Sequence, residues 1–273
     1  IFESDKSTKA YEEEVMLVGL GIAEDTGEGQ AVGYDSGGEA WVSRYKHKKV
    51  TKAFSVTEEA VDDNQYHNVA SLYSKSAARA IRTREEVDGA GVLNNGFSAS
   101  HLGGDGAPLF SNLHPLSGPS GGYGVNTFAT QADLSDDSLQ DMVNMISRAT
   151  DDRGVPIMLR PQKLVVAVEN NFTAQRILHS DLRSGTANND QNALKAQRSI
   201  PKGHCVNHYI TDPDMWVVLT DADQGLRHFD RKGVKKSSEY DFDTGNLRVK
   251  FTRRFSFGWT NWRGGYGSSG SAI

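Results

Sequence analysis

The sequence contains a single cysteine, Cys205, so the chain cannot form an internal disulfide, and its stability has to come from burial and from partners. No apolar run approaches the roughly 18 residues that a membrane span requires. The stretch IFESDKSTKAYEEE at residues 1–14 lacks the basic and apolar regions of a signal peptide. These absences exclude a disulfide framework and argue against a membrane protein. The length of 273 residues fits one large domain or two small ones.

The net charge is −5, which argues against a general nucleic-acid coat, but the charge is distributed unevenly. Residues 1–40 hold ten acids and two lysines, residues 41–60 hold five bases and two acids, and residues 226–273 hold ten bases and four acids. Such asymmetry is compatible with ordinary solvated surface. Alternatively, acidic and basic parts of different copies meet and set the register of an assembly.

The stretch AEDTGEGQAVGYDSGGEAW at residues 23–41 is rich in glycine, as phosphate-binding loops are. A P-loop also needs a lysine and a serine or threonine after its last glycine, and it joins a strand to a helix. This stretch has no lysine and no helical pattern directly after it, and a dinucleotide fingerprint fails for the same reason. Its acids would repel a phosphate; they are Glu24, Asp25, Glu28, Asp35 and Glu39. We interpret the glycines as turns in a flexible arm, and we expect no cofactor.

Two other clusters raise the question of catalysis or metal binding. On a strand, His204 and His208 would share a face but lie about 13 Å apart, too far for one metal, so we predict no metal site and treat Cys205 as a buried inert thiol. Asp105, Ser111 and His114 lie close together in the sequence DGAPLFSNLHP, which leaves open a hydrolase with a Ser-His-Asp arrangement. This serine lacks a nucleophile elbow, and a turn-rich loop anchored by its apolar residues is the simpler interpretation.

Residues 41–56 alternate in places and favour a protruding two-stranded ribbon, because charged strands and glycine turns make a poor core. Thr57 then predicts the start of a helix over residues 57–88, which no proline or glycine interrupts until Gly89 and which would be about 48 Å long. The sequence NLRVKFTRRFSFGWTNW predicts a strand over Leu247–Trp259 of about 43 Å. One face of this strand is apolar except for Arg253. A long helix laid on a long strand would form an elongated plate, which a compact enzyme rarely needs.

The part of the chain between these elements predicts a compact α/β unit over residues 127–240, whereas residues 89–126 are loop-like. Ser135 caps a clear helix over Leu134–Ala149. A buried strand, Lys163–Val168, precedes a helix capped by Asn170 or Asn171, and the sequences NHYITD and MWVVLT predict two further strands.

An acidic arm, a glycine-rich ribbon, a long helix, an α/β unit and a long closing strand, in this order, resemble the major capsid protein of tailed double-stranded DNA phages. Three stretches carry the resemblance. FSVTEEAVDDNQY (residues 54–66) is similar to the ribbon-to-helix junction of phage head subunits, including the Mu-like group. DGAPLFSNLHP (residues 105–115) resembles a recurring capsid loop, D-G-x-x-L-F-S-x-x-H-P, and LRPQKLVVAVENNFTAQRIL (residues 159–178) resembles a strand and helix of the axial domain.

The resemblance implies an α+β fold, the phage major-capsid fold shared by tailed phages and herpesviruses. It implies an N-arm at residues 1–20, an extended loop (E-loop) at 21–56, a peripheral domain with a long spine helix at 57–126 and 241–273, and an axial domain at 127–240. The E-loop would lie over a neighbouring subunit. The contact residues that we predict are Glu24, Asp25, Glu28, Tyr34, Asp35, Glu39, Trp41, Arg44, Lys46, Lys48 and Lys49.

The function implied by the resemblance is a structural subunit, not an enzyme, that assembles as hexamers and pentamers into the icosahedral head. The shell would enclose DNA without sequence-specific contact, and the subunit would assemble in the host bacterial cytoplasm. Portal, scaffold and decoration proteins are further candidate partners, and no membrane is expected. No residue pattern matches the lysine–asparagine crosslink of some family members. The hydrolase, or another phage part such as a tail-tube or decoration protein, is the alternative.

Overall fold

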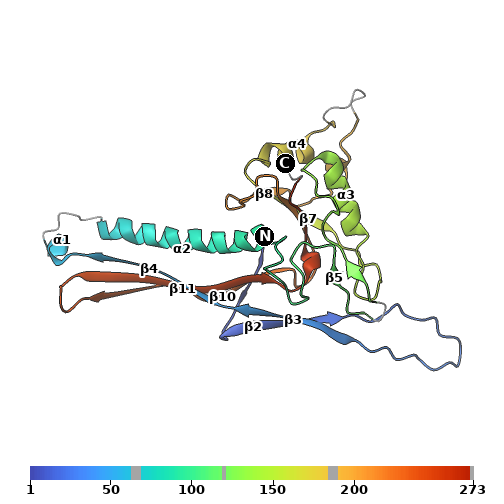
Figure 1. The fold of residues 1–273 in the computed structure, drawn as a ribbon, viewed down its shortest axis with the longest axis horizontal. Helices are drawn as coiled ribbons and strands as arrows, with labels where there is room; N and C mark the ends of the chain where they lie inside the picture. Colours follow the sequence, from blue (N-terminus) through green and yellow to red (C-terminus); the bar gives the residue numbers. More distant parts are fainter. Residues whose placement is uncertain (63–68, 119–120, 184–189, 271–273) are drawn as a thin grey trace.

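The computed structural model describes residues 1–62, 69–118, 121–183 and 190–270. Figure 1 shows an elongated molecule, in which a long sheet carrying one long helix extends to one side of a lobe with a second sheet. A loop between two further strands extends to the other side. Among the described residues, no helix is long and apolar enough to span a membrane.

The long sheet has the strand order β1-β10-β11-β4. Its central strands, β10 (Leu226–Tyr240) and β11 (Leu247–Trp259), are antiparallel neighbours in sequence and in space. β4 (Lys48–Val56) pairs antiparallel with β11, and β1 (Glu3–Lys6) pairs parallel with β10. The predicted strand over Leu247–Trp259 is confirmed at both ends.

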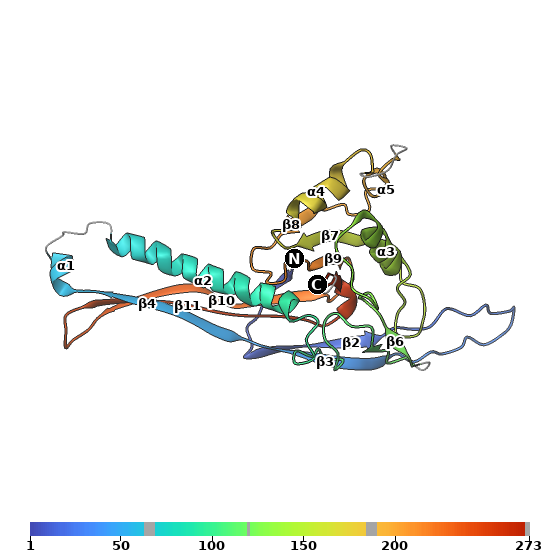
Figure 2. The ribbon, with the colours of Figure 1, turned by 45° about the horizontal axis from the view of Figure 1, so that its top comes forward.

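The helix α2 (Val69–Asn94) lies along one face of the long sheet, over β4 and β11, as Figures 1 and 2 show. A small apolar core joins helix and sheet, with Ala77 and Ile81 from α2 and Val249 and Phe251 from β11. The elongated plate that the sequence predicts is therefore present, and its core is a thin seam along the helix.

The predicted helix over residues 57–88 differs from the structure at both ends. A short helix, α1 (Glu58–Asp62), begins beside the predicted cap Thr57, and residues 63–68 of the prediction lie outside the described part of the chain. α2 continues beyond residue 88 through Gly89 and Gly91 to Asn94. A glycine within a helix costs roughly 0.5–1 kcal/mol relative to alanine. However, a Cβ at Gly89 would lie 3.4 Å from the ring of Phe257, so this glycine lets the helix approach β11 closely.

Arg253, the one charged residue on the apolar face of β11, forms an ion pair with Glu85 of α2. The same carboxylate lies 3.4 Å from the imidazole of His228 on β10. The side chains of Arg253 and Glu85 are only 16% and 14% exposed. The break in the strand pattern is therefore a largely buried ion pair that joins helix and sheet.

The ribbon consists of β2 (Tyr11–Val18) and β3 (Gly38–Lys46), which pair antiparallel, with residues 19–37 connecting them (Figure 1). This pairing differs from the ribbon predicted within residues 21–56. The strand that pairs with β3 is β2, which lies in the predicted N-arm. β4, which was expected in the ribbon, pairs with β11 in the long sheet. The three consecutive glutamates of β2 hide the alternation that predicts a strand. In the structure they form ion pairs with residues such as Arg44 on β3 and Arg227 on β10.

The lobe holds the second sheet, of order β12-β9-β7-β8, with helices packed against it. The strands are β12 (Gly265–Ser268), β9 (Trp216–Thr220), β7 (Pro161–Val166) and β8 (His204–Val206), and the helices are α3 (Asp136–Ser147), α4 (Asn171–His179) and α5 (Ala193–Ala196). One face of the sheet packs against all three helices, and the other face packs against the end of α2 and the loop that follows it. Both faces are therefore buried.

Several local predictions for the lobe can be scored. The helix capped by Ser135 is confirmed, and the cap is a capping box with Ser138. The strand predicted for NHYITD is wrong, because β8 ends at Val206 and a turn follows. Short elements complete the chain: β5 (His114–Pro115), β6 (Tyr123–Gly124) and the 3₁₀ turn η1 (Trp262–Gly264).

Sheet membership differs from the predicted division of the chain at residue 240. β10, which the prediction places in the α/β unit of residues 127–240, forms the long sheet with β11. β12, which the prediction places with the long helix, pairs with β9 in the lobe. Local patterns could not show these pairings, because β12 and β9 are separated by the whole β10–β11 hairpin.

Candidate inter-subunit surface

The loop of residues 19–37 is fastened to the lobe at its base by one carboxylate. Asp35 accepts a hydrogen bond of 2.7 Å from the backbone amide of Gly21 and pairs with Arg153 at 2.8 Å. The hydrogen bond from Gly21, and next the guanidinium of Arg153, lower the pKa of Asp35. Arg153 also donates to the carbonyl of Ser36 at 2.5 Å. The predicted contact residue Asp35 thus holds its own chain, and sequence reasoning missed its partner Arg153.

Beyond this base, the loop is exposed throughout. Glu24, Asp25 and Glu28 are exposed, and Tyr34 is fully exposed. Three further apolar side chains are also more than half exposed, namely Leu20, Ile22 and Val32. Several apolar side chains exposed on one segment are typical of a surface that binds another protein.

The ribbon is anchored to the body by a polar network around the end of β11. The indole of Trp41 donates to the carbonyl of Thr260 at 2.9 Å, and the hydroxyl groups of Tyr45 and Thr260 are 2.5 Å apart. Thr260 also donates to Glu14, whose other oxygen lies 2.8 Å from Arg227. Burial raises the pKa of Tyr45 above its usual range. Trp41 is only 8% exposed, so its side chain is an internal anchor and is not accessible to a neighbour in this conformation.

The remaining predicted contact residues lie on β3 and β4. Arg44 pairs with Glu13 of β2 at 2.6 Å and lies over the ring of Tyr11. Glu39, Lys46 and Lys49 are exposed. Lys48 lies 3.8 Å from Asp88 of α2. The structure therefore does not gather the predicted residues at one place: they follow the loop, the ribbon and the edge of the long sheet.

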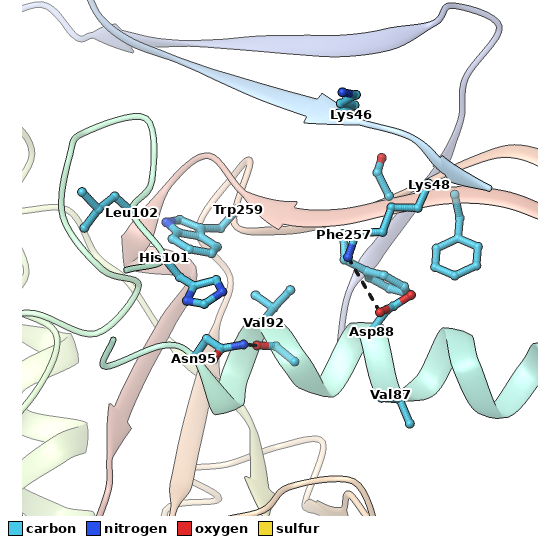
Figure 3. A pocket seen from close by; sticks show the side chains of 13 residues that line it. Lys46, Lys48, Val87, Asp88, Val92, Asn95, His101, Leu102, Phe257 and Trp259 are labelled. Atoms are coloured by element: carbon cyan, nitrogen blue, oxygen red, sulfur yellow. Dashed lines mark hydrogen bonds and ion pairs between the residues drawn. The ribbon is translucent and has the colours of Figure 1, made fainter. Parts of the chain in front are cut away.

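Figure 3 shows a hollow of about 420 Å³ between α2, β3 and β11. Its walls are mainly apolar, with Val92, Phe257 and Trp259 among them, and Lys46 and Lys48 lie at its β3–β4 side. Ser256 in its lining lies 3.0 Å from His47, but both side chains are buried in the junction of ribbon and sheet. By its chemistry the hollow could accept an apolar side chain that lies beside a carboxylate.

The face of the long sheet opposite α2 is basic. Lys49, Arg254 and Lys232 are direct cross-strand neighbours on β4, β11 and β10. Lys250 and Lys235 lie on the same face farther along. Of this group, sequence reasoning predicted only Lys49 as a contact residue. The excess of bases in residues 226–273 was the signal for the others, but only the strand register shows that they share a face.

The hydrolase alternative for Asp105, Ser111 and His114 is wrong. Nδ1 of His114 lies 2.6 Å from Asp105, but Nε2 lies 3.2 Å from the side-chain oxygen of Asn126, where a triad would place the serine hydroxyl. The Ser111 hydroxyl instead accepts from the backbone amide of Leu113. His114 is completely buried and stacks on Trp262 at 4.4 Å, so no substrate can reach it. The three residues fix the loop structure.

The histidines that raised the question of a metal are held by local contacts. His204 contacts the side-chain oxygen of Asn171 at 3.1 Å, and burial, followed by the nearby His179, lowers the pKa of His204. His208 lies in the turn after β8. In the described part of the chain, no three His, Cys, Asp or Glu side chains are grouped as a metal site would require.

The family model for phage capsid protein matches residues 41–268. The capsid of cyanophage P-SCSP1u has a TM-score of 0.60 at 8% identity, over 97% of this chain and 85% of that chain. The capsid of Myoviridae phage XM1 has a TM-score of 0.58 at 10% identity, over 99% and 89%. The capsid of an empty GTA particle has a TM-score of 0.59 at 9% identity, over 100% and 88%. No curated protein sequence matches the chain.

At such low identities the solved structures establish the fold, which confirms the predicted phage major-capsid fold. The family match extends from the ribbon through the long helix and both sheets to β12. Its members are structural proteins of the virion shell and not enzymes, as predicted. On this match, the chain belongs to the phage capsid protein family.

Proposed function

We propose that this major capsid subunit assembles as hexamers and pentamers into an icosahedral head that encloses double-stranded DNA without sequence-specific contact. The observation that carries the proposal is the exposed loop of residues 19–37, which has apolar side chains and no core of its own. Burying such side chains against a neighbour is worth roughly 1.5–3 kcal/mol each when burial is complete. Closed rings of identical contacts then make many modest interfaces cooperative.

The proposed division of labour follows the predicted domains. Residues 1–20 act as the N-arm, 21–56 as the E-loop, 57–126 and 241–273 as the peripheral domain, and 127–240 as the axial domain around which capsomers close. The strand pairing favours assigning β10 to the peripheral sheet, β12 to the axial sheet and β2 to the E-loop ribbon. The similarity of residues 54–66 to head subunits supports placement in the Mu-like group.

Within the E-loop, the exposed carboxylates and Tyr34 are the proposed contacts to a neighbour, together with exposed lysines on β3 and β4. Asp35, Trp41 and Arg44 support those contacts by holding the loop base and the ribbon in place. Assembly would occur in the host bacterial cytoplasm. Portal, scaffold and decoration proteins are proposed partners of the finished shell.

The test replaces Ala23–Gly33 with a short Gly-Ser linker, which keeps the base formed by Gly21, Asp35 and Arg153. We expect a soluble folded subunit that forms no stable shells, whereas the unchanged chain gives closed particles in negative-stain electron microscopy. The matched control replaces the exposed turn residues Asp243 and Thr244 at the far end of the long sheet with Gly-Ser. Intact particles from the loop-replaced chain would contradict the role of the loop, and absence of particles from the unchanged chain would contradict the proposed function.

A further inference from the structure

Three cations lie side by side across the long sheet with no anion among them. Lys49 of β4 is opposite Arg254 of β11, which is opposite Lys232 of β10. Since neighbouring strands are about 4.8 Å apart, the three residues lie within about 10 Å. Like charges that are directly opposite on a sheet destabilise it. Among the described residues, no carboxylate pairs with any of these three side chains, which we call the cation row.

The cation row lies on the open face of the sheet. Val249, Phe251 and Arg253 of β11 face α2, and Arg254 has the opposite parity along the strand. Lys49 and Lys232 are exposed. Farther along the same face, Arg248 is neutralised by Asp241 at 2.6 Å. The positive charge on this face therefore begins at the cation row and continues through Lys235 and Lys250.

The ribbon of the same chain lies against this same face, nearer the lobe. The ring of Tyr45 on β3 packs on Phe229 of β10 at 4.8 Å, and a Cβ at Gly258 of β11 would lie 2.8 Å from Tyr45. Figure 2 shows the ribbon on one side of the long sheet and α2 on the other. In a shell one subunit thick, all copies present the same side outward. The loop of one copy is then on the same side of the shell as the cation row of the next copy.

The loop carries negative charge, which would neutralise the cation row. Residues 19–37 contain four acids and no base, and three of these acids, Glu24, Asp25 and Glu28, are exposed and form no ion pair in the described chain. The loop precedes β3, whereas Lys49 follows this strand, so the nine residues of β3 keep the loop away from the row of its own chain. Complementary charges at such a contact fix its register and exclude wrong partners.

We propose that the cation row Lys49–Arg254–Lys232 is the receiving site for the Glu24–Glu28 segment of a second copy of this chain. The inference rests on the proposed function, since it names the surface that the E-loop contacts. Each carboxylate–cation pair is partly solvated and individually weak, but the pairs repeat around every ring. The contact weakens as salt rises, because exposed charges are screened.

The experiment reverses the row by Lys49→Glu and Lys232→Glu. These exposed residues flank Arg254, so the fold gains cross-strand ion pairs while the row changes from +3 to −1. We expect shell formation to require at least about tenfold more protein, because like charges then face each other. Adding Glu24→Lys and Asp25→Lys to the reversed chain restores complementarity and should recover assembly. Lys75→Glu with Arg79→Glu, exposed on α2, is the control of equal charge change.

The particle yield of each variant is measured by electron microscopy and light scattering at several protein and salt concentrations. Recovery by the charge swap, with the α2 control close to the unchanged chain, supports the inference. Unaltered assembly of the row-reversed chain overturns it. Loss of assembly without recovery also overturns it and assigns the row to another anion, such as packaged DNA. In both contrary cases the unchanged chain still forms shells, so the proposed function stands.

Discussion

The lobe and the extended loop of this chain differ in where their apolar side chains find contacts. In the lobe, Ile146, Leu164 and Trp216 are completely buried between one sheet and three helices. In the loop, Ile22 is 75% exposed and Tyr34 is fully exposed. The lobe therefore gains its stability within one chain, whereas the loop has little to gain until a neighbour covers it. Folding therefore rests on the lobe, and in the proposed shell assembly rests on the loop.

The largest expected effect on stability comes from Trp216→Ala in the lobe, the part of the chain that buries its own apolar side chains. The ring is completely buried and its indole donates to the carbonyl of Ala132 at 3.0 Å. Losing a buried tryptophan costs about 3–5 kcal/mol in the free energy of unfolding. Urea denaturation of the subunit measures this loss. The control is Tyr34→Ala in the loop, which should leave the unfolding midpoint unchanged but reduce shell formation; equal losses in the two variants would contradict the comparison.

The limits of the sequence analysis follow the same division. The strand Leu247–Trp259 and the helix capped by Ser135 were predicted because their patterns are local. The role of Arg253 could not be predicted, since it depends on which residue of a distant helix faces it. Gly89 favours the end of a helix by propensity alone, but its close packing on Phe257 overrides this preference.

The candidate site was predictable in character and not in arrangement. The exposed acidic loop could be recognised from its glycines and acids, because such a segment cannot form a core. Its base could not, since Arg153 follows Asp35 by more than a hundred residues. The cation row is a product of register across three strands, and a shift of one residue in either pairing would move its members to opposite faces.

A smaller effect should appear at the junction of ribbon and long sheet when the pH is lowered. His47 is buried there, with its ring nitrogens 3.0 Å from the hydroxyl groups of Ser7 and Ser256. Burial, followed by the charge of Arg254, lowers the pKa of His47 from 6.5, and Arg231 acts in the same direction against Glu12. Because the unfolded chain binds the proton more readily, stability should fall as the pH drops below 6.5 and level off below the folded pKa.

Thermal unfolding at a series of pH values measures this effect, with His47→Gln as the comparison. The glutamine amide keeps a donor and an acceptor between the serines but does not titrate in this range. The variant should lose the part of the pH dependence that lies just below pH 6.5. An identical pH dependence in both proteins would contradict the assignment to His47.

The smallest expected effect on stability, and the sharpest on the loop, comes from Arg153→Ala. The Asp35 side of its ion pair is open to solvent, so its removal should change the free energy of unfolding only slightly. The loop base should nevertheless open, because Arg153 holds both Asp35 and the carbonyl of Ser36. Limited proteolysis should then cleave within residues 22–33 faster than in the unchanged chain.

In the unchanged chain, cleavage should accelerate only as the pH falls below 3.8 and through the lowered pKa of Asp35, where this contact is lost. An acid-stable protease is needed for that arm, and Arg148→Ala, an exposed arginine after α3, is the matched control. Cleavage at equal rates in Arg153→Ala and the unchanged chain would show that the base does not restrain the loop.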